Sequence, residues 1–95
     1  MSEWKFAQSK PEQQLCLITY FGYTRQQTDG DVDFVIAVRE YVTPRDPAMK
    51  YYATADKFTN QKTMEFQPCG WGNTLLAALG ECLRSIERFP YEGPR

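Results

Sequence analysis

The alternation of apolar and polar residues predicts two long β-strands in the first half of the chain. Residues 15–23 and 33–42 alternate with a period of two and are rich in β-branched and aromatic side chains. In the second segment Phe34, Ile36 and Val38 share one face. We expect this face to lie in the hydrophobic core.

Two shorter strands are predicted further along the chain. Residues 50–58 and the brief segment 63–67 keep a weaker alternation, and we expect them to continue the sheet. The segments 25–31, 43–47 and 59–62 are rich in glycine, proline and polar residues, so they are predicted to be turns. Connections this short favour antiparallel pairing of consecutive strands.

A helix is predicted over residues 74–88, with Asn73 as its N-cap and Pro90 just beyond its end. Its apolar residues recur at helical spacing and are expected to pack on the sheet; they are Leu75, Leu76, Leu79, Cys82, Leu83 and Ile86. Gly80 lies in the middle of the helix, where glycine is unfavourable unless another backbone comes close. We therefore expect a close approach at Gly80.

Together these elements predict one α+β domain over residues 1–95. Its sheet is a four-stranded antiparallel meander, and the C-terminal helix packs on one face. Residues 1–13 are predicted to form an N-terminal arm. Residues 89–95 form a short tail with aromatic side chains, which we expect to fold back onto the sheet.

A single helix covers only one face of such a sheet, so the other face is predicted to be an interaction surface. Arg39 and Tyr41 share a strand face, and further aromatic and basic residues lie on neighbouring strands. The candidate binding residues are Arg39, Tyr41, Tyr20, Tyr23, Lys50, Tyr51 and Lys57. Such residues are enriched in protein interfaces and also form stacking platforms for single-stranded bases. A homodimer or another protein partner is the first prediction, and single-stranded nucleic acid is the alternative.

The segment 36–41, followed by a turn and by Met49-Lys50, resembles the strand-and-turn motif of positive-cofactor-four-type transcriptional coactivators. The resemblance covers about a third of the chain. It implies a dimer of four strands and one helix that binds single-stranded DNA in a basic groove of the sheet. Carried over to this sequence, the binding positions would be Arg39, Tyr41 and Lys50.

Composition narrows the classes of function. The chain has 11 lysines and arginines and 12 acidic residues, which gives a net charge of −1. This charge supplies no global attraction to nucleic acid or anionic membranes. Without histidine the chain lacks the usual proton shuttle and the commonest metal ligand. Its three cysteines have no paired spacing. We expect a cytoplasmic, non-catalytic protein with no cofactor, no metal and no membrane partner.

Two short motifs are better explained as connections than as ligand sites. The segment Gly70-Trp71-Gly72 precedes a helix as a phosphate cradle does, but it lacks the third glycine of a dinucleotide fingerprint. It is predicted to be a flexible connection with Trp71 folded onto the core. Asp29, Asp31 and Asp33 lack the glycine and glutamate that a calcium loop requires, so a solvated turn is predicted.

Overall fold

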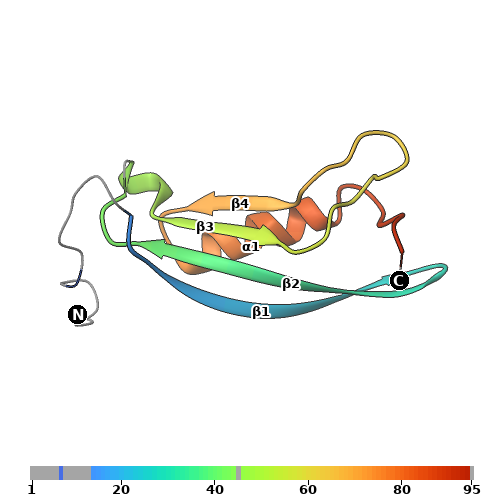
Figure 1. Cartoon of the computed structure of the whole chain (residues 1–95), viewed down its shortest axis with the longest axis horizontal. Coiled ribbons are helices and arrows are strands. Elements are labelled where there is room, and N and C mark those ends of the chain that lie inside the picture. The colour runs from blue at the N-terminus through green and yellow to red at the C-terminus, as the bar shows by residue number, and fades with distance from the viewer. Residues whose placement is uncertain (1–6, 8–13, 45, 95) are drawn as a thin grey trace.

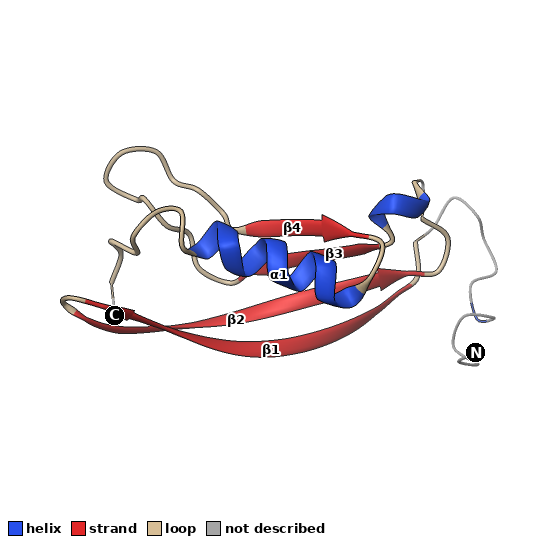
Figure 2. Ribbon diagram, turned by 180° about the vertical axis from the view of Figure 1, so that it is seen from behind, coloured by secondary structure: helices blue, strands red, loops and turns tan. Residues whose placement is uncertain are grey.

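The structure is a computed structural model that describes residues 7, 14–44 and 46–94. Four antiparallel strands form one open sheet in the order β1-β2-β3-β4. The elements are β1 (Cys16–Gln27), β2 (Gly30–Tyr41), β3 (Tyr51–Ala55), β4 (Cys69–Gly72) and α1 (Leu75–Ile86). Figure 1 looks at the sheet from the side away from α1, and Figure 2 shows α1 across the other side. The predicted α+β meander with a C-terminal helix on one face is confirmed.

Strands β1 and β2 form a longer hairpin than the sequence pattern predicts. All 12 residues of each strand are paired, from Cys16 opposite Tyr41 to Gln27 opposite Gly30. Gly30 has a φ of 129°, which favours glycine, and it stands where the tight turn meets β2. The predicted turn over 25–31 is wrong in its extent. The side chains of Arg25 and Gln27 continue the strand because they donate hydrogen bonds to backbone carbonyls at the end of α1 and in the C-terminal tail.

The other half of the sheet departs further from the prediction. Strand β3 covers only part of the predicted strand 50–58. The predicted strand 63–67 is wrong, because it contributes only an isolated bridge between Phe66 and Thr59. The fourth strand is β4, in the glycine-rich segment that the pattern assigned to a connection. Strand propensity is low there, and pairing with β3 outweighs it.

The glycines of β4 allow it to lie directly beneath the helix. A Cβ atom on Gly70 would be 2.4 Å from the Ala78 carbonyl oxygen, and one on Gly72 would be 2.9 Å from the Ala78 nitrogen. Strand and helix therefore meet backbone against backbone. The close approach expected at Gly80 is wrong, since a Cβ atom there would meet only Arg84 Nη1, at 3.6 Å.

The helix begins one residue later than predicted. Thr74, and not Asn73, is the N-cap, and its Oγ1 accepts a hydrogen bond from the Ala77 N–H at 3.1 Å. Glu87 is the C-cap, so the helix ends shortly before the predicted limit at residue 88. The cap fixes where α1 starts relative to the end of β4.

The predicted apolar stripe of α1 packs on the sheet except for Leu76, with Leu75, Leu79 and Leu83 partly buried against the core. Ala78, Cys82 and Ile86 are fully buried against the sheet, whereas Leu76 is 76% exposed. The helix directs Ala78 toward the sheet because the small alanine side chain allows the close contact with Gly70. Burial raises the pKa of the Cys82 thiol to about 12, so Cys82 behaves as an apolar core residue.

The C-terminal tail completes the core, as predicted, through the described residues 89–94. The Tyr91 ring is 7% exposed and meets Phe34 edge to face, with 6.2 Å between the ring centres. The Gln27 side chain pairs with the Tyr91 backbone, accepting from its N–H at 2.8 Å and donating to its carbonyl at 3.1 Å. The predicted arm over residues 1–13 lies outside the described residues, apart from Ala7.

Candidate interaction surface

Strand alternation gives the sheet two faces of different character. One face packs on α1, and we call the other the open face. It is defined by the outward residues of the strands, which are Cys16, Ile18, Tyr20, Gly22, Thr24, Gln26, Asp31, Asp33, Val35, Ala37, Arg39, Tyr41, Tyr52, Thr54, Cys69 and Trp71.

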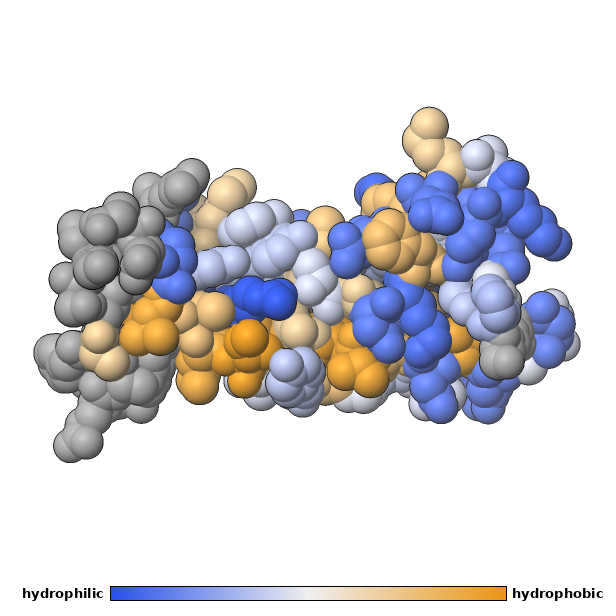
Figure 3. Space-filling model, in the orientation of Figure 1, coloured by the Kyte–Doolittle hydropathy of each residue, from blue (hydrophilic) through white to orange (hydrophobic). Residues whose placement is uncertain are grey.

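Large hydrophobic side chains of the open face are exposed. Tyr20 is 67% exposed, Val35 45%, Trp71 39% and Ile18 37%. Figure 3, seen from the side away from α1, shows hydrophobic residues gathered in a band over β1 and β2, interrupted by hydrophilic ones. A band of this kind on a small domain is typical of an interface.

A row of four residues crosses the open face near its middle. Register places Ile18, Arg39, Tyr52 and Trp71 side by side on the four strands. The rings of Tyr52 and Trp71 are stacked, with 4.1 Å between their centres and 29° between their planes. Burial, with a smaller effect of Cys69, raises the pKa of the Tyr52 hydroxyl. Arg39 Nη1 donates to Thr54 Oγ1 at 3.4 Å, so the guanidinium lies along the surface.

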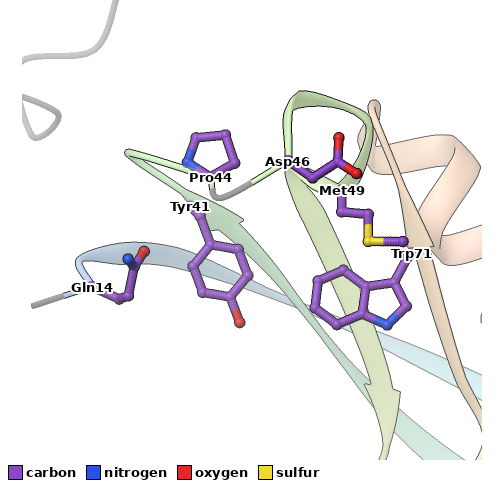
Figure 4. Close-up of a pocket in the computed structure, with 6 residues that line it drawn as sticks. All are labelled: Gln14, Tyr41, Pro44, Asp46, Met49 and Trp71. Atoms are coloured by element: carbon purple, nitrogen blue, oxygen red, sulfur yellow. The ribbon is translucent and has the colours of Figure 1, made fainter. Parts of the chain in front are cut away.

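The open face is hollowed beside this row, at the end of the sheet where β2 leaves it. The pocket has a volume of about 340 Å³ and is lined by Gln14, Tyr41, Pro44, Asp46, Met49 and Trp71. Figure 4 shows the Tyr41 and Trp71 rings on opposite sides of the hollow, with the Met49 thioether beside the indole. The lining is apolar apart from Gln14, Asp46 and the Tyr41 hydroxyl.

Three of the predicted binding residues lie on the open face, namely Arg39, Tyr41 and Tyr20. Tyr23 and Tyr51 are on the helix side, where both are partly buried against the core. Tyr23 donates from its hydroxyl to Glu87 Oε1 at 2.5 Å. This hydrogen bond raises the pKa of Tyr23, and partial burial raises it further by a smaller amount. The structure does not bring these two tyrosines together with Arg39.

The two predicted lysines are engaged in local ion pairs. Lys50 Nζ lies 3.6 Å from Glu40 Oε2 and also approaches the Tyr51 ring, on the helix side of the sheet. Lys57 Nζ lies 3.3 Å from Asp56 Oδ2 and donates to a backbone carbonyl of β2 at 2.5 Å. Neither lysine adds a positive charge to the middle of the open face.

Three exposed large hydrophobic residues of the open face are absent from the predicted site, namely Ile18, Val35 and Trp71. For Ile18 and Val35 the signal was present, because each alternates in sequence with residues of the core face. The predicted burial of Trp71 against the core is wrong, because β4 turns its side chain to the open face, where it stacks on Tyr52. The sequence does contain an indication of this, because Trp71 lies between Gly70 and Gly72. In a strand, a residue points to the face opposite to that of its two neighbours, so glycines that face the helix direct Trp71 away from it.

Charge on the open face is divided along its length. Asp31 and Asp33 lie near the hairpin turn, whereas Arg39 lies six or more residues further along β2. Asp33 Oδ1 accepts from Thr24 Oγ1 at 2.7 Å, which holds this carboxylate on the surface. The face therefore has an acidic end, an apolar middle and a basic position near the pocket.

Within residues 7, 14–44 and 46–94, no cluster of three or more acidic, cysteine or histidine side chains could hold a metal ion. The same residues contain no helix with the length and hydropathy of a membrane span. No known protein family, no curated protein sequence and no solved structure matches this chain.

Proposed function

We propose that this protein is a non-catalytic binding module whose open face packs against a second copy of the chain. The observation that carries the proposal is the band of exposed hydrophobic residues on that face, of which Tyr20, Val35 and Ile18 are the most central. Two sheets that pack face to face remove such residues from water, and burial of a single large side chain contributes roughly 1.5–3 kcal/mol.

The charge pattern along β2 supports a symmetric pairing. A two-fold axis between Val35 and Ala37, with the two β2 strands antiparallel, brings Arg39 of one copy opposite Asp33 of the other. The same operation brings Tyr41 opposite Asp31, where a hydroxyl can donate to a carboxylate. Each favourable pair occurs twice, because the interface uses the same surface on both copies. Charge complementarity of this kind fixes the register of an interface.

The first test is the solution mass measured by sedimentation over a range of protein concentrations. The expected mass is twice 11.0 kDa. Val35→Glu places a charge in the apolar middle of the open face and should give a monomer. The matched control is Leu76→Glu, which changes an even more exposed apolar residue on the outer side of α1 and should leave the dimer intact. A monomeric parent protein, or a dimer lost only in Leu76→Glu, contradicts the proposal.

A charge exchange tests the symmetric arrangement itself. Arg39→Asp and Asp33→Arg should each weaken the dimer, since like charges then face one another. Mixing the two single variants should restore a heterodimer, and the double variant in one chain should restore a homodimer. If both single variants dimerise as the parent does, the two-fold axis is elsewhere.

A second candidate function is binding of single-stranded nucleic acid on the same face. The stacked rings of Tyr52 and Trp71 beside Arg39 favour it, because bases stack on aromatic side chains and arginine contacts phosphate. Oligonucleotide retention should then fall steeply between about 50 and about 200 mM salt. Trp71→Leu should reduce retention, whereas Leu76→Glu should not. An oligonucleotide that fails to bind at about 50 mM salt contradicts this candidate.

A further inference from the structure

We propose that the pocket between Tyr41 and Trp71 binds a quaternary ammonium group. This inference does not depend on self-association, because the pocket lies at one end of the open face and all its lining residues come from one chain. Neither self-association nor nucleic-acid binding requires a ligand in this pocket.

The pocket exists because one side chain has left the open face. Lys50 lies opposite Tyr41, and alternation along β3 would place its side chain on the open face beside Tyr52. The Lys50 backbone instead has φ −66° and ψ −28°, outside the strand region, and its ammonium reaches Glu40 on the helix side. Among the described residues, the space between Tyr41 and Trp71 is therefore left without the Lys50 side chain and its charge.

The walls suit a cation with an apolar shell. The faces of tyrosine and tryptophan rings attract cations through their electron-rich π-systems, and tryptophan is the strongest of the aromatic side chains in this respect. Figure 4 shows the Tyr41 and Trp71 rings directed into the same space from β2 and β4. Met49 adds an apolar, polarizable wall, and the pocket volume of about 340 Å³ leaves room for a methylated ammonium and part of its substituent.

The charged residue of the pocket lining also favours a cation, since the lining contains Asp46 and not Arg39. Asp46 lines the pocket and is exposed, and one of its carboxylate oxygens, Oδ1, accepts from the Ala48 N–H at 3.0 Å. Among the described residues, no ion pair or hydrogen bond engages its other oxygen. An anionic ligand such as a phosphate would meet this carboxylate, which excludes the nucleic-acid backbone as the preferred occupant of the pocket.

The scarcity of acceptors selects a quaternary over a primary ammonium. A primary ammonium has three N–H donors, and the lining side chains that could accept from them, those of Asp46, Gln14 and Tyr41, lie on separate sides of the pocket (Figure 4). A quaternary ammonium has no N–H donor, so it loses no hydrogen bond on entering an apolar pocket. The methyl groups spread the charge over a surface that contacts the rings.

The first experiment compares choline with 3,3-dimethylbutan-1-ol, a neutral molecule of the same shape. The Trp4→Phe variant leaves Trp71 as the only tryptophan, so its fluorescence reports the pocket. We expect choline to bind with a dissociation constant on the order of 1 mM, and the neutral analogue to bind about tenfold more weakly. Equal binding of the two probes, or no choline binding at about 50 mM, overturns the proposal.

Substitutions locate the site. Asp46→Asn keeps a side chain that can accept the Ala48 N–H, but it removes the charge, so choline should bind about threefold to tenfold more weakly with no loss for the neutral analogue. Tyr41→Leu should weaken choline binding about tenfold. The matched control is Tyr20→Leu, an exposed tyrosine of the same face outside the pocket lining, which should bind as the parent does. Unchanged binding in both pocket variants overturns the proposal.

The quaternary ammonium could belong to a free small molecule or to a trimethylated lysine of a partner. A peptide carrying trimethyl-lysine should bind more tightly than choline if residues at the pocket rim contact the peptide on either side of the methylated lysine. Equal affinities assign the pocket to a free ligand. Tighter binding of the unmethylated peptide than of the methylated one contradicts a quaternary ammonium site. These titrations can fail while the dimer persists, so the two proposals are tested separately.

Discussion

The two faces of this sheet are built from alternate residues of the same strands, yet they have opposite exposure. On β2, Phe34 and Ile36 are 1% and 0% exposed, while Val35 between them is 45% exposed. Both faces are apolar in their middle, so hydropathy alone does not distinguish core from surface. The helix makes the difference, because it covers the face on which β4 has no side chains.

The same comparison explains how the partner surfaces arise. On the helix side Gly70 and Gly72 let α1 approach closely, so small residues fill the gap. On the open side Trp71 stands between these glycines and projects outward. One short segment thus closes the core on one face and presents its largest ring on the other.

Substitution of core and surface aromatics should show the largest difference between the two faces. Phe34→Ala removes a buried ring that contacts Tyr91, and it should lower the free energy of unfolding by about 4 kcal/mol. Tyr20→Ala, on the open face, should change it by less than about 0.5 kcal/mol in a monomer. Urea unfolding at low protein concentration measures both. Comparable losses would mean that the open face is also packed within one chain.

Glycine substitutions sharpen the comparison at the backbone. Gly70→Ala adds a methyl group where the Ala78 carbonyl lies, so α1 must move, and the expected loss is about 3 kcal/mol. Gly22→Ala, on the open face, adds the same group where nothing lies within 4 Å. It should be neutral or stabilising by up to about 0.5 kcal/mol, because alanine loses less backbone entropy than glycine. Urea unfolding of the two variants compares them directly. Similar losses would show that α1 does not press on β4.

Polar residues of β1 extend the comparison to hydrogen bonds. On the helix side Arg25 Nη1 donates to the carbonyls of Ile86 and Phe89 at 2.7 and 2.5 Å, where the end of α1 carries partial negative charge. Arg25→Met should therefore cost about 2 kcal/mol. On the open face Thr24→Val removes only an exposed hydrogen bond to Asp33 and should cost less than about 0.5 kcal/mol. Thermal unfolding ranks the pair, and a larger loss for Thr24→Val would contradict the assignment.

The smallest expected effect is a pH dependence at Tyr23. Its hydroxyl donates to Glu87, and this raises the pKa of Tyr23 above that of an unfolded tyrosine. The stability from this contact is present below pH 10, the ordinary pKa of tyrosine, and is lost as pH rises through the folded value. The difference in stability between the parent and Tyr23→Phe should therefore shrink above pH 10. A difference that grows with pH would reverse the sign and contradict the contact.

Much of the fold was predictable because it depends on local periodicity. The spacing of apolar residues along the chain predicts the core face of β2 and the order of strands and helix. The aromatic residues of the tail likewise predict that it folds back onto the core. The fourth strand was not predictable in this way, since glycines at 70 and 72 weaken strand propensity and gain their reason only from the helix above them. The candidate site was found in part for the same reason, with Arg39 and Tyr41 anticipated and Trp71 missed.

The sequence by itself determined the class of fold and the presence of more apolar strand surface than one helix covers, because a period of two puts alternate residues on opposite faces. Only the tertiary structure decided which glycines the helix packs against, which way Trp71 points, and where the Lys50 side chain goes. These choices depend on strand register and on contacts between residues far apart in the chain, which no local pattern contains.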